Sequence, residues 1–96
     1  MQARAWREAV VDAERIVLAV NGAIAEDGEL LSSAERDDLL THIERVQTLM
    51  TSNDVTQVDA VRTASDALAH ASEDFAARRM DKAIANALSG QSIDSL

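Results

Sequence analysis

The stretch QARAWREAVVDAERIVLAVNGAIAE, residues 2–26, carries the clearest structural pattern of the chain. Its apolar side chains recur every three or four residues, which places them on one side of an α-helix. They are Trp6, Val10, Ala13, Val17, Val20 and Ile24, with Val11, Ile16 and Ala23 beside them. Gly28 is the predicted stop, because glycine adopts the left-handed conformation at little cost. The stretch therefore predicts a long amphipathic helix that needs partner helices.

A second helix is predicted to begin at Ser32 or Ser33. The segment from Ser32 to Glu35 fits a capping box, in which the serine hydroxyl and the glutamate carboxylate satisfy backbone N–H groups at the helix start. The apolar side of this helix comprises Leu39, Ile43, Val46 and Met50, with Leu40 and Leu49 beside them. Residues 51–54 should end it and cap the next helix.

A third helix is predicted from about Val55, with Asp54 as its cap. Its apolar residues are Val58, Val61, Ala64, Leu68, Ala71 and Phe75, and a further set comprises Met80, Ile84, Ala87 and Leu88. The step from Phe75 to Met80 breaks the helical spacing. We therefore expect a kink near 76–79, or a separate helix that turns a new side inward. Gly90 should end this helix, and residues 91–96 should form a frayed tail.

The composition favours an all-α fold. The chain has 96 residues, no proline, 3 glycines and only 2% aromatic residues, and it is rich in helix formers. Short connections between long helices indicate antiparallel neighbours. We predict a single domain over residues 1–96, built as an antiparallel three-helix bundle with a kinked or additional C-terminal helix. The first helix should overhang, because the second is shorter.

The charge pattern limits the partners. A formal net charge of -8 disfavours nucleic acid and anionic membranes, whose phosphates need a basic surface. The chain has no cysteine, so disulfides and thiolate metal sites are excluded. No apolar run approaches the ~20 residues needed to span a bilayer, and no signal-peptide pattern appears. The lack of cysteine is compatible with a reducing cytosol, and we expect a cytoplasmic protein. Since Met1 leads straight into helical sequence, we expect the chain to be part of a larger protein.

Residues suited to catalysis or metal binding are sparse. Glu35, Asp38 and His42 share one side of a helix at ligand-like spacing, but a solvated acidic face is the favoured interpretation. The other histidine, His70, has no comparable neighbours. The serines occupy caps and exposed positions, and no glycine-rich phosphate loop is present. We therefore expect no catalytic, cofactor or metal site, and no enzyme activity, in this chain.

Arg78, Arg79 and Lys82 form the one basic cluster of the sequence. Ion pairing, between helices or with the nearby acids, is the favoured interpretation. The nearby acids are Glu73, Asp74 and Asp81. The alternative is that Arg78 and Arg79 contact another domain.

Trp6 has two interpretations. A buried ring would anchor the core, whereas an exposed ring would be a contact hot spot, where tryptophan is enriched. We favour exposure or self-association, and expect Trp6→Ala to change self-association more than folding.

The stretch FAARRMDKAIANALSGQSID, residues 75–94, resembles the C-terminal end of HscA-type chaperones, DnaK-like members of the seventy-kilodalton heat-shock family that act in iron–sulfur cluster assembly. The segment LLSSAER, residues 30–36, resembles a helix start of the same family. The resemblance extends over essentially the whole chain. The matching residues near the C-terminus are Phe75, Arg78, Arg79, Met80, Asp81, Ala87, Leu88, Gly90, Ser92, Ile93 and Asp94.

The resemblance implies that the chain is the helical lid of a substrate-binding unit, gating peptide release from a β-sandwich of the same protein. It also implies an ATPase domain that uses ATP and Mg, the scaffold IscU as substrate and HscB as co-chaperone. By position, residues 11–18 would contact the β-sandwich. The family pattern at this contact is an acidic residue with a histidine four residues later, and it is absent here because the residue four after Glu14 is Leu18. Candidates for lid docking or self-association are Trp6, Val10, Val11, Asp12, Glu14 and Arg15. The competing hypothesis is a stand-alone helical adapter or self-associating module, in which the fragment forms a homodimer.

Overall fold

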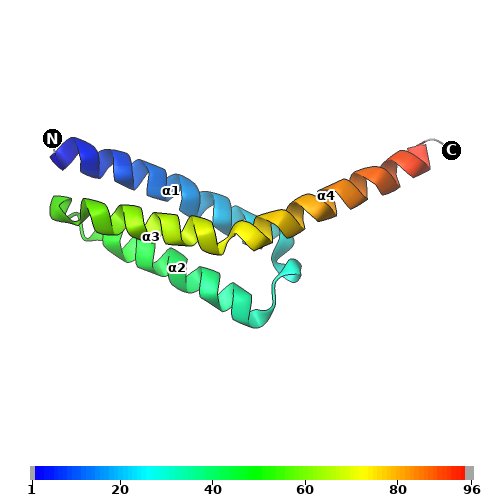
Figure 1. The fold of residues 1–96 in the computed structure, drawn as a ribbon, viewed down its shortest axis with the longest axis horizontal. Coiled ribbons are helices and arrows are strands. Elements are labelled where there is room, and N and C mark those ends of the chain that lie inside the picture. The colour runs from blue at the N-terminus through cyan, green and yellow to red at the C-terminus, as the bar shows by residue number, and fades with distance from the viewer. Residues whose placement is uncertain (1, 95–96) are drawn as a thin grey trace.

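The computed structural model describes residues 2–94, and within them the fold is all-α, as predicted (Figure 1). The helices are α1 (Gln2–Asp27), α2 (Ser33–Thr51), α3 (Val58–Ala71) and α4 (Glu73–Asp94), with short 3-10 helices at Gly28–Leu30 and Val55–Gln57. The helices α1, α2 and α3 run antiparallel to their chain neighbours and pack together as a bundle. The helix α4 projects past the end of this bundle, so that the molecule measures 60 × 28 × 17 Å.

The predicted apolar sides of the first three helices meet in one core. Most of the expected residues are buried, although Val10 is only half-buried and Ala9 lies deeper. Leu68, Val46 and Val61 are the largest fully buried side chains. The core comprises Trp6, Ala9, Ala13, Val17, Val20, Ala23, Ile24, Leu39, Ile43, Val46, Val61, Ala64, Leu68 and Phe75. Periodicity located this core because burial in a helical bundle follows the helix repeat.

The two connections use local capping. The predicted capping box of α2 is confirmed: the Glu35 N–H donates to Ser32 Oγ at 3.1 Å, and the Ser32 N–H donates to Glu35 Oε1 at 2.9 Å. Asn53 has a φ of 52°, the left-handed conformation that asparagine tolerates. Asp54 then accepts the Thr56 N–H at 3.0 Å, and this starts a 3-10 helix. As a result α3 begins at Val58 rather than near Val55.

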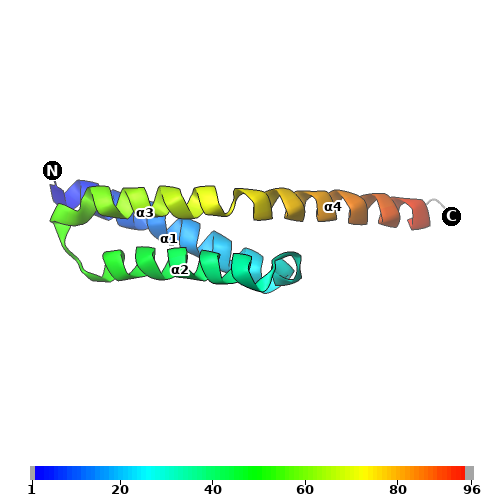
Figure 2. The same ribbon diagram turned by 60° about the horizontal axis from the view of Figure 1, so that its bottom comes forward.

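The chain breaks its helical path at Ser72, earlier than the predicted kink near 76–79. The Ser72 hydroxyl donates to the Ala69 carbonyl oxygen at 2.9 Å, and its N–H donates to the Leu68 carbonyl oxygen at 3.0 Å. The N–H bond is the ordinary bond of the helical ladder, whereas the hydroxyl bond to the carbonyl three residues back is a local side-chain bond of the kind that competes with it. Ser72 therefore marks the place where α3 ends. Figure 1 shows α4 bending away from the direction of α3 at this break and continuing beyond the bundle, although the two helices lie in line in the view of Figure 2.

Two expectations about this last helix are wrong. It does not turn a new apolar side inward, since Met80, Ile84 and Leu88 are 65%, 53% and 58% exposed. Nor does Gly90 end it, because α4 continues to Asp94. Fraying of residues 91–96 stays a prediction, and residues 95–96 lie outside the described range.

The predicted overhang of the first helix is also wrong. The α1 N-terminus lies beside the α2–α3 connection, and α1 contacts both α3 and the 3-10 helix Val55–Gln57 (Figure 1). Trp6 is therefore only 7% exposed and belongs to the core, so its expected exposure is wrong. The α2–α3 connection reaches beyond the end of α2 and covers the start of α1. The helix that overhangs the bundle is α4 instead.

Candidate interaction surfaces

The base of α4 is tied to the α1–α2 connection by a group of ion pairs, which we call the clasp. It consists of Arg78, Arg79 and Lys82 from α4 with Glu26, Asp27, Glu29 and Glu35. The Arg78 guanidinium makes a two-pronged contact with Glu35, with Nη1–Oε1 at 2.9 Å and Nη2–Oε2 at 2.7 Å. Its Nη1 also donates to the Leu30 carbonyl oxygen at 2.9 Å. Such a bidentate pair fixes the orientation of both side chains.

Asp27 is the central acid of the clasp. Its carboxylate accepts from Arg79 Nε at 2.8 Å and from Lys82 Nζ, and its side chain is only 15% exposed. The same cations reach outward, because Arg79 Nη2 lies 2.8 Å from Glu26 Oε2 and Lys82 Nζ lies 2.7 Å from Glu29 Oε1. The last residue of α1 is thereby joined to the first turns of α4.

The clasp shifts the pKa values of its members. Hydrogen bonds from Arg78, and then from the Ser32 backbone N–H, lower the pKa of Glu35 to about 2. Hydrogen bonds from Arg79 and then Lys82 lower the pKa of Asp27, and the hydrogen bond from Lys82 lowers the pKa of Glu29. These carboxylates are therefore held in the charged form that the clasp requires.

We expect the Arg78–Glu35 pair to survive mild acid. A carboxylate whose pKa is lower in the folded state than in the unfolded state stabilises the fold above the unfolded value. For Glu35 that contribution is complete above its ordinary pKa of 4.5, and it is lost as the pH falls toward about 2. A carboxyl NMR titration of Glu35 should therefore show a midpoint far below 4.5.

In the matched variant Arg78→Gln the Glu35 midpoint should move up toward its ordinary value, although the Ser32 N–H still holds it somewhat low. A wild-type midpoint near 4.5 would contradict the pairing.

The structure changes the partners expected for the basic cluster. The three cations form ion pairs between helices, which is the interpretation we favoured. Within the described residues, however, none of them pairs with Glu73, Asp74 or Asp81. Sequence reasoning missed Glu26, Asp27 and Glu29 as partners. The signal that could have found them is the acidic run around Gly28. A contact from Arg78 or Arg79 to another domain stays a prediction.

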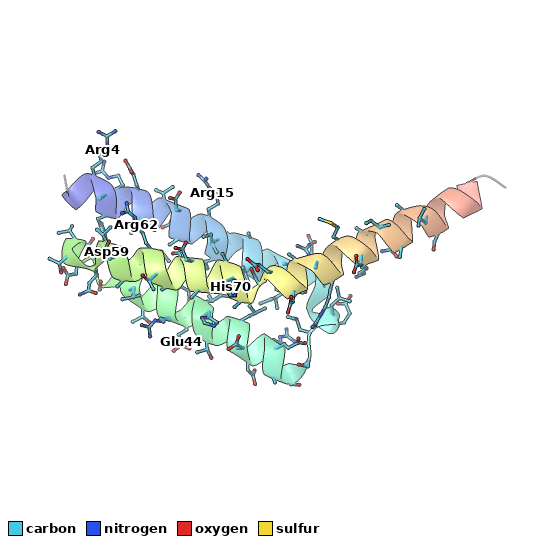
Figure 3. All side chains as sticks on the ribbon, viewed as in Figure 1. Arg4, Arg15, Glu44, Asp59, Arg62 and His70 are labelled. Atoms are coloured by element: carbon cyan, nitrogen blue, oxygen red, sulfur yellow. The ribbon has the colours of Figure 1, made fainter. Side chains whose placement is uncertain are left out.

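The residues expected to dock the lid lie along α1, some within its apolar stripe and the others on its exposed surface. Asp12, Arg15 and Ile16 line a shallow groove with Arg62 and Asp66 of α3. Figure 3 shows Arg15 extending outward from α1, with Arg62 where α3 meets α1. This groove offers charges of both signs, which suits a polar contact.

The other docking candidates differ in their surroundings. Val11 is 46% exposed and Glu14 is exposed, whereas Val10 is half-buried and Trp6 is buried. The structure therefore brings Asp12 and Arg15 together in one groove, and it places Trp6 in the core. Their docking role stays a prediction.

The side chains weighed for metal binding are otherwise engaged. Glu35 points to Arg78, while His42 Nε2 lies 3.7 Å from Asp38 Oδ2. His70 Nδ1 lies 3.5 Å from Glu73 Oε2 on the exposed surface. Within the described residues, no three acidic or histidine side chains gather as a metal site. In the same part of the chain, no helix is long and apolar enough to cross a bilayer.

Comparison with known proteins gives a consistent result. No protein-family model matches the chain. Over all 96 residues it is 45% identical to the chaperone protein HscA homologue of Burkholderia multivorans, 46% to that of Herminiimonas arsenicoxydans and 43% to that of Burkholderia mallei. The chain spans about 15% of the length of each of these relatives. Along its whole length, the chain is therefore similar to the C-terminal segment of HscA-type chaperones.

Proposed function

We propose that this chain is the lid of the substrate-binding unit of an HscA-type chaperone, and that it slows the release of bound peptide. The observation that supports this proposal is the similarity to HscA homologues over every residue of the chain, at 43–46% identity. A lid acts by closing over a peptide that is held elsewhere. It therefore lowers the dissociation rate while making few peptide contacts of its own.

The geometry suits a body that moves as a unit. The core spans α1, α2 and α3, and the clasp fixes the base of α4 to the end of α1. Such a body transmits motion along its length because packed helices deform little. In this proposal the groove around Asp12 and Arg15 faces the peptide-binding β-sandwich of the same protein.

The remainder of the proposal concerns the longer protein. Its ATPase domain would bind ATP with Mg, and ATP binding would shift the lid toward the open state by favouring that conformation. The substrate would be the scaffold IscU, and HscB would stimulate ATP hydrolysis during iron–sulfur cluster assembly in the cytoplasm. The similarity to chaperones supports these roles only through the family.

The test is the dissociation rate of a labelled, proline-containing IscU-type peptide from the full-length chaperone, with and without these 96 residues. We expect deletion to speed release by roughly tenfold or more, or about 1.4 kcal/mol, at a similar association rate. Arg15→Glu should speed release in part, whereas Arg45→Glu on the exposed side of α2 should not. An unchanged dissociation rate after deletion would contradict the lid function.

A stand-alone helical adapter is the second candidate. The exposed apolar side chains of α4 favour it, because a helix with an uncovered apolar side commonly binds a partner. An unchanged peptide dissociation rate, together with capture of a partner by α4, would support the adapter.

A further inference from the structure

The projecting helix α4 carries an apolar strip that nothing in the described chain covers. We call Ala77, Met80, Ile84, Ala87 and Leu88 the outer face of α4. At about 100° per residue these positions fall on one side of the helix. All five are exposed, and the three large ones are more than half exposed. The outer face is therefore an apolar surface at the helical spacing that a partner helix recognises.

The outer face lies on the side of α4 away from its attachment. Phe75, Arg79 and Lys82, which hold the base of the helix, lie about half a turn around from Ile84. Beyond them, every side chain from Ala83 to Ser89 is exposed. A short helix without packing is marginal in water, since tertiary contacts normally stabilise it. A partner helix on the outer face would supply the missing contacts.

The charge distribution selects the occupant. The chain carries a net charge of -8, yet no charged residue occurs from Ala83 to Ile93. The cations at the base of α4 are already paired in the clasp. We call the uncharged stretch from Ala83 to Ile93 the arm. It offers no charge to attract a strongly charged partner. It is also the part of α4 where the acidic residues of a second copy would meet the least electrostatic repulsion.

We propose that the outer face of α4 pairs antiparallel with the outer face of α4 in a second copy of this chain. Antiparallel pairing places the two acidic bundles at opposite ends of the joined helices. With Ile84 on the axis of the pair, Phe75 of one copy, at the end of its bundle, lies eighteen residues along the joined helices from Phe75 of the other, or roughly 27 Å at 1.5 Å per residue. This exceeds the Debye length of about 8 Å at physiological salt, so the repulsion between the bundles is largely screened. Parallel pairing would bring the bundles together.

The register follows from the symmetry. A two-fold axis makes each residue face its counterpart across the centre of the pair. With Ile84 at the axis, Met80 faces Leu88 of the second copy, and the small side chains of Ala77 and Ala87 let the helices approach closely. The contact is smaller than the ~800 Å² per partner of a standard interface, so the dimer should be weak.

The first test uses the absence of cysteine from the chain. The single-cysteine variant Ile84→Cys places a thiol at the axis of the pair. The matched variant Asn86→Cys places it on the opposite side of the same exposed helix. Under mild oxidation with copper phenanthroline, Ile84→Cys should form a disulfide-linked dimer roughly tenfold faster, because the dimer holds its thiols at about millimolar effective concentration. Equal rates would overturn the proposal.

The second test measures association by sedimentation equilibrium of the 96-residue chain, which has its own core. We expect a monomer–dimer equilibrium with a Kd weaker than about 1 µM, read at chain concentrations up to about 1 mM. Ile84→Glu should abolish it, whereas Leu18→Glu adds the same charge at a 71% exposed site on α1 and should not. A monomer at the highest concentration would overturn the proposal and leave the outer face to a different protein.

Salt separates this pairing from an ionic contact. Raising salt from about 50 mM to about 500 mM should strengthen the dimer, because screening reduces the repulsion between acidic bundles. Weakening by salt, or a dimer that persists in Ile84→Glu, would place the contact on charged surfaces and overturn the proposal.

Discussion

Replacing Trp6 with alanine will lower the free energy of unfolding of the chain by about 3–5 kcal/mol. The ring is 7% exposed and belongs to the core. It lies near the start of α1, where that helix meets α3 and the 3-10 helix Val55–Gln57. The alanine leaves a cavity that the surrounding helices fill only in part. Urea denaturation followed by circular dichroism will measure the loss.

The matched control for Trp6→Ala is Leu18→Ala on the same helix. Leu18 is 71% exposed, so this change should alter stability by no more than about 0.5 kcal/mol. A small stability loss in Trp6→Ala together with weaker self-association would show that the ring is a surface contact after all.

Replacing Phe75 with alanine will have an effect of similar size, about 3–5 kcal/mol. Phe75 is 3% exposed, and among the described side chains of α4 it is the buried one. It belongs to the same core as Val20 and Ala23 of α1. The variant should therefore be less stable and should also hold α4 less firmly, since only the clasp then ties the helix to the bundle.

Two measurements separate these effects of Phe75→Ala. Urea denaturation gives the stability, and electron–electron resonance between spin labels at Glu44→Cys and Asn86→Cys gives the distance from α2 to α4. We expect a broader distance distribution in Phe75→Ala than in the parent. Leu88→Ala, at a 58% exposed position, should leave both unchanged in dilute solution. An unchanged distribution in Phe75→Ala would mean that the clasp alone positions α4.

Local patterns in the sequence were enough to predict the helices, most of their buried sides and the start of α2. These features depend on residues three or four apart, which every turn of a helix brings together. Leu39, Ile43 and Val46 could be assigned to the core on spacing alone, and the Ser32–Glu35 box marked its helix start correctly. The whole-chain resemblance to HscA-type chaperones was also contained in the sequence.

Contacts between distant parts of the chain, which no local pattern specifies, fix the clasp, the burial of Trp6 and the free side of α4. Arg78 and Arg79 find carboxylates 43 and 52 residues away, and no local periodicity reports which ends of a bundle meet. Trp6 is buried because the α2–α3 connection reaches the start of α1. The break at Ser72 sends α4 past the bundle, so Ile84 keeps a core-like spacing without a core to enter. Spacing defines an apolar side, and only the arrangement of the helices in space determines whether anything covers it.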